Sequence, residues 1–195
     1  IGKHALPVEQ WLEIDRYALA MTRQLQTELA AHYASYEFLQ VAQKLQSFCS
    51  EDLGGFYLDI LKDRLYTTAR DSRARRAAQN ALYHITQTLT RLMAPILSFT
   101  GEEVHATLTR EPDSSVFFHT WHALPEQAGE EASIARWQQI RAIRAEVLKE
   151  LENARAAGQI GSSLQAEVIL HAKPETHALL ASLGDDLRFV LITSR

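Results

Sequence analysis

The sequence predicts a mainly α-helical protein, an antiparallel helical bundle with a small α/β appendage at its C-terminal side. Apolar residues recur at steps of three and four over long stretches, most clearly from Ala78 to Ile96. Short connections separate these stretches, so consecutive helices should pack as antiparallel neighbours and bury their stripes against each other. After Gly158 the helical period gives way to a short alternating segment, which predicts the appendage.

The first predicted helix covers residues 6–33, and Pro7 stands near its start, where a missing backbone donor is harmless. Its apolar stripe consists of Trp11, Ile14, Ala18, Met21, Leu25 and Leu29. Ser35 is expected to cap a second helix whose stripe extends to Cys49.

Gly54 and Gly55 predict a break or a tight packing point, after which helical spacing resumes as far as Tyr66. This third helix is expected to be shorter than the first two.

A fourth helix is expected to have Asp71 as its N-cap and to end near Met93, because Pro95 cannot continue a helix. Thr100 and Glu103 have the spacing of a capping box, which would open a fifth and shorter helix.

The period fails from 111 to 132, a stretch that contains two prolines and a glycine and is interpreted as an extended connector. Ser133 then starts a long helix that Gly158 should stop. We therefore divide the chain into a bundle over 1–110, the connector, and a region over 133–195 that holds the long helix and a small α/β subdomain.

Within that last region, residues 166–172 are predicted to form a strand and residues 174–184 a helix. Residues 187–193 fit a strand or a helix equally well.

The composition is that of an ordinary globular protein, with 46% hydrophobic and 23% charged residues. The single Cys49 excludes an internal disulfide and fits a reducing compartment, so we predict a cytoplasmic protein. No run of 18 apolar residues and no secretion signal is present, and we expect no membrane partner.

The charge is unevenly distributed along a chain of net charge -4. Residues 62–76 contain six basic and two acidic residues, whereas residues 1–61 contain four basic and eight acidic ones. A short positive segment on an acidic protein suits a polyanion that is held in one place. Arg73, Arg75 and Arg76 would lie in the first turn of the fourth helix, where cations oppose the helix dipole and phosphates would offset that cost.

The sequence offers little support for a catalytic site or a metal site. His119 and His122 have the spacing of metal ligands but no third ligand nearby, and they are interpreted as connector surface. The phosphate-loop, dinucleotide and nucleophile-elbow motifs are absent. We predict no catalytic residue and no metal ligand in this chain.

The stretches FCSEDLGGFYLDILKDRLYT and RRAAQNALYHITQTLTRLMAPILSFTGEEV resemble the anticodon-binding region of bacterial isoleucyl-tRNA synthetases. So do LPVEQWLEIDRYAL, ARAAGQIGSSLQAEVIL and LGDDLRFVLITS, in the same order. The resemblance covers nearly the whole chain and implies the helical bundle of class I synthetases.

The resemblance further implies an enzyme that joins isoleucine to its tRNA with ATP and magnesium, and we expect a monomer. The HIGH and KMSKS signatures of the catalytic fold are absent here. The family's first bundle helix, with an Arg-Asn-Thr element, would precede Ile1. Its zinc-binding cysteine cluster would follow Arg195, so we expect a piece of a larger enzyme.

We hypothesise that this piece binds the anticodon stem-loop of the isoleucine-accepting tRNA. The residues expected to contact it are Lys62, Arg64, Tyr66, Arg70, Arg73, Arg75 and Arg76, and a weaker group, Arg141, Arg144, Arg155 and Gln159, near the IGSSL turn. The alternative is a helical protein-interaction or structural module that binds no RNA.

Overall fold

The structure is a computed structural model that describes residues 4–111 and 113–194, and for Asp63 the backbone only. The chain divides into two compact units, of which the first ends at Glu131 and the second begins at Ala132. The described chain is 71% helical and contains no strand, so the prediction of a mainly helical protein is confirmed. None of its helices is both long and apolar enough to cross a bilayer.

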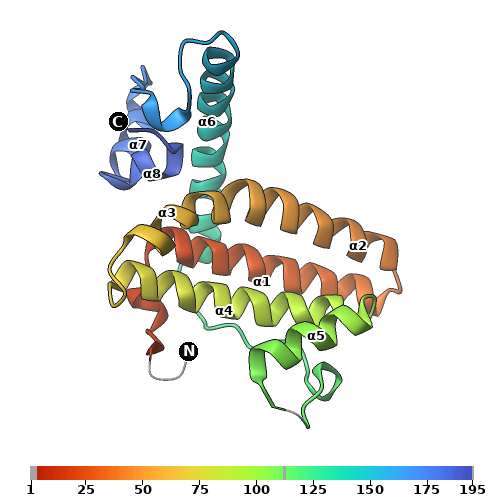
Figure 1. Cartoon of the computed structure of the whole chain (residues 1–195). Helices are drawn as coiled ribbons and strands as arrows, with labels where there is room; N and C mark the ends of the chain where they lie inside the picture. The colour runs from red at the N-terminus through yellow and green to blue at the C-terminus, as the bar shows by residue number, and fades with distance from the viewer. Residues whose placement is uncertain (1–3, 112, 195) are drawn as a thin grey trace. The chain divides into compact units, whose positions relative to one another are not determined.

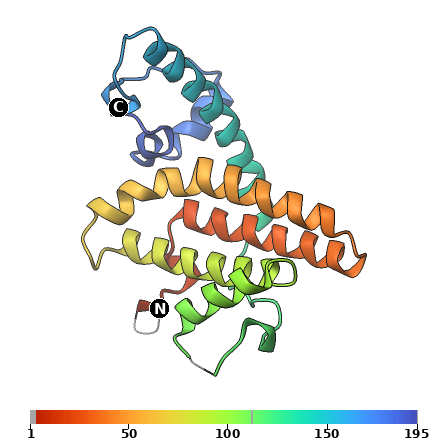
Figure 2. The ribbon, with the colours of Figure 1, turned by 45° about the vertical axis from the view of Figure 1, so that its right-hand side comes forward.

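The first unit is built around α1 (Glu13–Ala34), which lies between the antiparallel helices α2 and α4 (Figures 1 and 2). Its stripe is buried as predicted, with Ala18 and Leu29 at 0% exposure. The helix begins later than residue 6, because Pro7 opens a separate 3-10 turn, η2 (Val8–Gln10). That turn places the Trp11 side chain in the core.

The second and third predicted helices form one continuous helical segment. It consists of α2 (Phe38–Ser47), the π-helical η3 (Phe48–Leu58) and α3 (Asp59–Thr67). Of the two alternatives predicted for Gly54 and Gly55, the break is therefore wrong, whereas the backbone does pack closely there: a Cβ at Gly54 would lie 3.2 Å from the Cys49 carbonyl oxygen. Both glycines are exposed within the wider π-helical turns, while Phe48, Leu53, Phe56 and Tyr57 hold that stretch in the core.

The predicted cap at Ser35 is also wrong. Ser35 ends α1, and its backbone N–H donates to the Ala31 and Tyr33 carbonyls. Tyr36 then takes a left-handed conformation with φ 59°, which reverses the chain, and Glu37 becomes the N-cap of α2.

α4 (Arg73–Met93) ends where predicted, two residues before Pro95. Its N-cap is Ser72 and not Asp71: the Ser72 hydroxyl accepts a hydrogen bond from the Arg75 backbone N–H at 3.2 Å.

α5 (Ser98–Thr109) begins before Thr100, so the predicted capping box does not form. Gly101 lets α5 approach the end of α4 closely, since a Cβ there would lie 3.0 Å from the Ala94 Cβ. Glu102 instead accepts hydrogen bonds from the Ser115 hydroxyl and the Val116 N–H, which precede and open the turn η4 (Val116–Phe118).

The second unit contains most of α6 (Glu130–Ala156), η5 (Ser163–Gln165), α7 (Pro174–Ala181) and α8 (Asp186–Leu191). Gly158, with φ +71°, follows the end of α6 as predicted. Val147, Leu151, Ala166 and Leu191 form a core that joins α6 to the later segments.

The predicted small α/β subdomain is wrong for the described residues. Residues 166–172 lack a paired strand, and residues 187–193 are mainly helical. The alternating pattern of 166–172 does give an extended segment, but a strand also needs a neighbouring strand, which the described chain does not offer.

Candidate nucleic-acid interface

The basic segment surrounds the turn between α3 and α4, at the end of the bundle opposite the α1–α2 turn (Figure 1). Local hydrogen bonds build this turn. The Thr68 hydroxyl donates to the Arg64 carbonyl at 2.6 Å and closes α3. The Ser72 N–H donates to the Ala69 carbonyl at 3.0 Å, and the Ser72 cap then opens α4.

Two cations of the basic segment are paired with carboxylates at the surface. Lys62 Nζ lies 2.7 Å from Asp59, one turn away on α3. Arg76 contacts Asp71 at 2.6 Å, and this guanidinium is the main cause that lowers the pKa of the exposed Asp71 carboxyl. These two pairs reduce the charge that either cation presents to an anion.

Arg64 belongs to a buried network. Its guanidinium lies 2.8 Å from the Asp15 carboxylate of α1, which is fully buried, and the Arg64 side chain is only 14% exposed. The Tyr57 hydroxyl donates to the same carboxylate at 2.8 Å. Arg64 therefore joins α3 to α1, and its charge is already satisfied inside the bundle.

Ionisation in this network follows from burial. Desolvation raises the pKa of the Asp15 carboxyl, while the Arg64 charge and the hydrogen bonds from Tyr57 and Arg64 lower it. The pKa of Tyr57 lies well above its usual value because the hydroxyl is buried beside that carboxylate. Tyr57 consequently remains a hydrogen-bond donor at any physiological pH.

Three arginines of the basic segment differ from these, and we name Arg70, Arg73 and Arg75 the arginine corner. Among the side chains that the structure describes, no carboxylate lies within ion-pair distance of any of them. Arg73 Nε donates to the Gln10 carbonyl at 2.6 Å, and Arg75 contacts the Thr68 carbonyl. Arg75 Nε is buried without a hydrogen-bond partner among the described atoms.

The arginine corner combines two kinds of anion donor. Arg73 and Arg75 occupy the first turn of α4, whose unpaired backbone N–H groups carry the positive end of the helix dipole. Guanidinium groups add planar forks that match phosphate oxygens. Tyr66, near the end of α3, is 85% exposed and presents an aromatic ring beside this turn.

The second predicted group in the IGSSL region does not form one surface. Arg144 is buried, and its Nε donates to the Val190 carbonyl at 2.7 Å. Arg155 is exposed but pairs with Glu152 through two contacts, at 2.6 and 2.9 Å. Arg141 is partly buried on α6 and makes internal interactions, and Gln159 is exposed beyond the end of that helix.

The two connector histidines do not converge on a metal site. His122 lies 2.9 Å from His84 of α4, Nε2 to Nδ1, and His119 lies near Ser114 and His105. Within the described residues no group of three or more potential ligands comes together. Burial beside His84 and Arg91 lowers the pKa of His122 to about 4.

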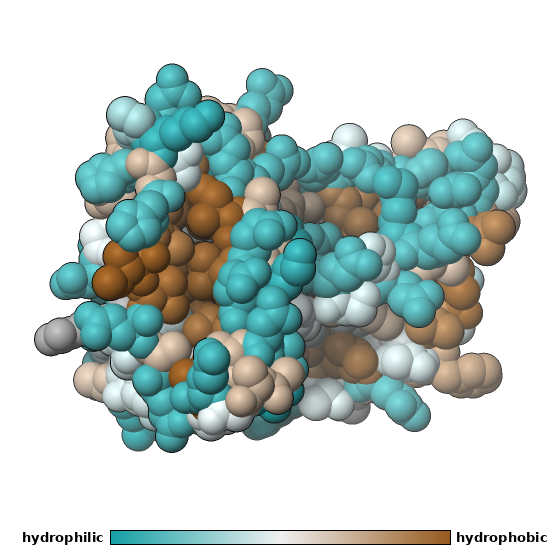
Figure 3. Space-filling view, turned by 90° about the horizontal axis from the view of Figure 1, so that it is seen from above, coloured by the Kyte–Doolittle hydropathy of each residue, from teal (hydrophilic) through white to brown (hydrophobic). Residues whose placement is uncertain are grey.

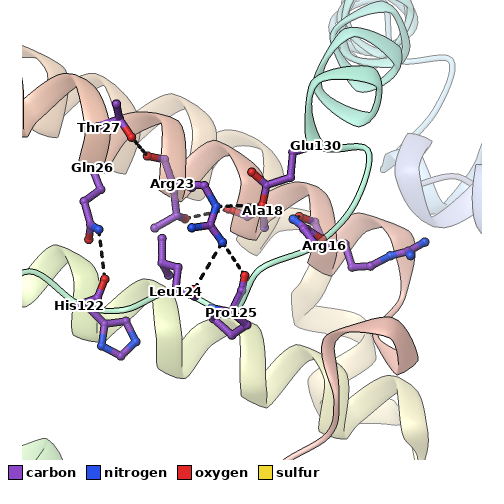
Figure 4. Close-up of polar contacts among 11 residues, drawn as sticks. Arg16, Ala18, Arg23, Gln26, Thr27, His122, Leu124, Pro125 and Glu130 are labelled. Carbon is purple, nitrogen blue, oxygen red and sulfur yellow. Dashed lines mark hydrogen bonds and ion pairs between the residues drawn. The ribbon is translucent and has the colours of Figure 1, made fainter.

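The side chains that fasten the connector to the bundle were not predicted from the sequence (Figure 4). Arg23 of α1 lies 2.9 Å from Glu130 and also donates to the Leu124 and Pro125 carbonyls. Gln26 donates to the His122 carbonyl at 3.1 Å. The connector is not extended throughout, because it holds the turn η4 and because α6 begins at Glu130 and not at the predicted Ser133. The carbonyls of its non-helical part accept these bonds, since no helix or strand pairs with them.

The buried Asp15 was missed as well, although the sequence carried a signal for it. Asp15 and Thr22 fall on the same three- and four-residue steps as the apolar stripe of α1. A charged residue in such a stripe predicts a buried partner. The sequence pattern does not identify that partner, because Arg64 is 49 positions away.

Comparison with known proteins identifies related sequences. The family described as the anticodon-binding domain of tRNA ligase matches residues 15–170. The chain is 72% identical over 193 residues to an isoleucine–tRNA ligase of Thiobacillus denitrificans, which covers 99% of this chain and 21% of that protein. It is 60% identical over 195 residues to the isoleucine–tRNA ligase of Azoarcus sp., covering 100% of this chain and 21% of that protein. The chain thus spans about a fifth of the length of these curated relatives.

Proposed function

The chain belongs to the family of anticodon-binding domains of tRNA ligases, and from this premise we propose that it binds the anticodon stem-loop of a tRNA. Its relatives are isoleucine–tRNA ligases, so the proposed tRNA is the one that accepts isoleucine. The complete protein would be a cytoplasmic enzyme that joins isoleucine to this tRNA with ATP. The chain itself would supply tRNA binding and no step of that chemistry.

The observation that carries the proposal is the arginine corner. Arg70, Arg73 and Arg75 retain their charge without a described carboxylate partner, whereas Lys62, Arg64 and Arg76 are paired. Three guanidinium groups lie at or just before the start of α4 with no described carboxylate partner, on a protein of net charge -4. They favour a localised polyanion, and RNA phosphates fit that description.

Tyr66 has a separate role in the proposal. Anticodon bases are splayed from their stack and are recognised by aromatic rings and by hydrogen bonds to their edges. An 85% exposed tyrosine beside three phosphate-binding arginines suits stacking on one such base. Arg155, Gln159 and Arg141 remain candidates for weaker contacts, and the buried Arg144 is assigned to the fold of the second unit.

The experiment replaces the three arginines of the corner in the complete ligase, once with glutamine and once with lysine. The triple glutamine variant should bind tRNA at least about tenfold more weakly at low salt. The slope of its log Kd plotted against log salt concentration should be smaller by about 2 to 3. Fluorescence polarisation with labelled tRNA across a salt series measures both quantities.

The triple lysine variant is the matched control. Lysine keeps the charge and loses only the bidentate fork, so the salt slope should stay close to that of the unmodified enzyme. Equal slopes for all three proteins would contradict phosphate contact by the corner and would favour the protein-interaction alternative.

A further inference from the structure

The segment Glu167–Ala172 is extended, yet its backbone is unpaired in the described structure. The connection to the rest of the unit precedes it: the Ser194 N–H donates to the Ala166 carbonyl at 3.2 Å, and the Ser194 hydroxyl donates to the same atom at 2.7 Å. From Glu167 to Ala172 no backbone N–H donates to any described group. Such a row of unpaired donors and acceptors can pair with another extended segment, as the edge strand of a β-sheet does.

The direction of the open edge follows from strand geometry. In an extended chain both polar groups of one residue point to the same edge, and successive residues alternate. The Ala166 carbonyl is directed at Ser194, so Glu167, Ile169 and His171 present their backbone groups to the opposite edge.

An apolar groove lies beside this segment. Figure 3 shows the exposed hydrophobic patch on the second unit. The groove has a volume of about 460 Å³ and is lined by Val168 and Leu170 of the extended segment together with Leu180, Leu187 and Leu191 of α7 and α8. Thr193 also lines it, and the Thr193 hydroxyl oxygen is buried without a hydrogen-bond partner.

The chemistry of the groove favours a polypeptide over RNA. Its lining is mainly aliphatic, and Arg188, its one guanidinium, lies over the Phe189 ring at 4.8 Å from the ring centroid. Glu167 and Asp185 place negative charge on the segment and at the groove. An extended peptide with alternating apolar residues would satisfy the backbone edge and fill the groove at once.

We propose that a segment elsewhere in the ligase polypeptide adds to Glu167–Ala172 as a β-strand and covers this groove. The curated relatives carry about four fifths of their length outside the matched region, so such a segment has an intramolecular source. A tethered segment acts at a high effective concentration and needs no second molecule. The inference rests on the chain being part of a ligase, and it does not depend on tRNA binding by the arginine corner.

Hydrogen exchange of the complete ligase without tRNA tests the proposal. The amides of Ile169 and His171 should exchange at least about a hundredfold more slowly than the same sequence in an unstructured peptide. The amides of Val168 and Leu170, which face the Ser194 side, should be less protected, and this alternation is the signature of an added strand.

Two variants test whether a change in the protection of the Ile169 and His171 amides comes from loss of the added strand or from general unfolding. Leu170→Asp places a charge in the groove and should abolish protection at Ile169 and His171 while amides of α4 stay protected. Glu167→Gln changes an exposed side chain of the opposite face and should leave the pattern intact.

Three outcomes would overturn the proposal. Exchange of Ile169 and His171 at the unstructured rate would show that nothing pairs with this edge. Protection that rises with protein concentration would assign the edge to a second copy of the chain, and protection that requires added tRNA would assign it to RNA.

Discussion

At the scale of single residues, position in the fold separates arginines that look alike in sequence. Arg64 and Arg75 stand eleven positions apart in the same basic segment. Arg64 faces a fully buried carboxylate, whereas Arg75 has no carboxylate partner among the described side chains. Substitution of the first should affect stability, and substitution of the second should affect binding of an anion.

Arg64→Met should destabilise the protein by about 3 kcal/mol, because it leaves the buried Asp15 carboxylate without its counter-charge. Chemical denaturation of the complete protein measures the loss. The double variant D15N/R64M removes both charges and keeps an acceptor for the Tyr57 hydroxyl, so it should lose clearly less. A double variant as unstable as the single one would show that the charge pair is not the cause.

His122 should make stability depend on pH. Its pKa is about 4 in the folded chain against 6.5 for an ordinary histidine, so the unfolded chain takes up the proton first as the pH falls. The free energy of unfolding should therefore decrease between about pH 6.5 and pH 4. The ring is only partly buried, which limits the decrease to the order of 1 kcal/mol.

Comparison of the unmodified protein with His122→Asn isolates this contribution, since the carboxylates titrate alike in both. The unfolding free energy of the variant should vary less over that range. The ring faces His84, and Arg91 also acts on it. A profile that is unchanged by the substitution would assign the pH dependence to other groups.

At the scale of elements, the start of α4 positions the arginine corner. Ser72 accepts from the Arg75 backbone N–H and so fixes where the first helical turn begins. The Asp71 carboxylate lies at the surface and contacts the Arg76 side chain instead. The two neighbouring residues therefore have separate roles, although either could cap a helix.

Ser72→Ala should cost about 1 kcal/mol of unfolding free energy through loss of the cap. Asp71→Ala is the matched substitution next to it and should cost much less, because it removes only an exposed ion pair. Thermal denaturation of the two variants side by side decides between them. A larger loss of unfolding free energy for Asp71→Ala than for Ser72→Ala would instead support Asp71 as the N-cap of α4, as predicted from the sequence.

At the scale of the whole molecule, side chains of α1 and α4 fasten the backbone of the connector, which comes 29 to 102 residues later in the chain. Arg23 reaches two carbonyls and one carboxylate of the stretch from Leu124 to Glu130. Arg91 donates to the Thr120 carbonyl at 2.9 Å in the same way. The connector is thereby part of the first unit's fold.

Arg23→Met should release the connector and raise the rate of chymotryptic cleavage near Trp121 by about tenfold, because local opening becomes easier. Arg16→Met makes the same chemical change on the same helix, and the Arg16 side chain makes none of these bonds (Figure 4). Its cleavage rate should stay at the level of the unmodified protein. Equal acceleration in both variants would point to a general weakening of α1.

How far the sequence predicts this molecule depends on the distance over which each interaction acts. The stripe of α4 from Ala78 to Leu92 and the end of the helix before Pro95 follow from neighbours within a turn or two, and both predictions are confirmed. Ile96, the last residue of the predicted stripe, lies beyond the helix and is 39% exposed. The choice between Ser72 and Asp71 as cap depends on backbone angles that two adequate capping residues do not determine. The alternation at 166–172 predicts an extended chain, but pairing requires a partner that the pattern does not contain.

The candidate site likewise has a part that follows from local sequence and a part that depends on contacts between distant residues. Clustering of cations in 62–76 is visible in the sequence and locates the corner. Which of them remain unpaired depends on contacts such as Asp15 with Arg64, which are remote in sequence. The division into three parts and the residues that contact tRNA stay predictions.

The buried Asp15–Arg64 contact has a consequence for how the chain folds. If α3 docked one turn too early or too late against α1, an isolated ion would be trapped in an apolar interior, at a cost of several kcal/mol. The contact therefore favours the correct alignment of α3 on α1, because misaligned packing that the apolar side chains alone would permit leaves a buried charge unpaired. Because α3 is held in one alignment, the turn between α3 and α4 also has one position relative to α1.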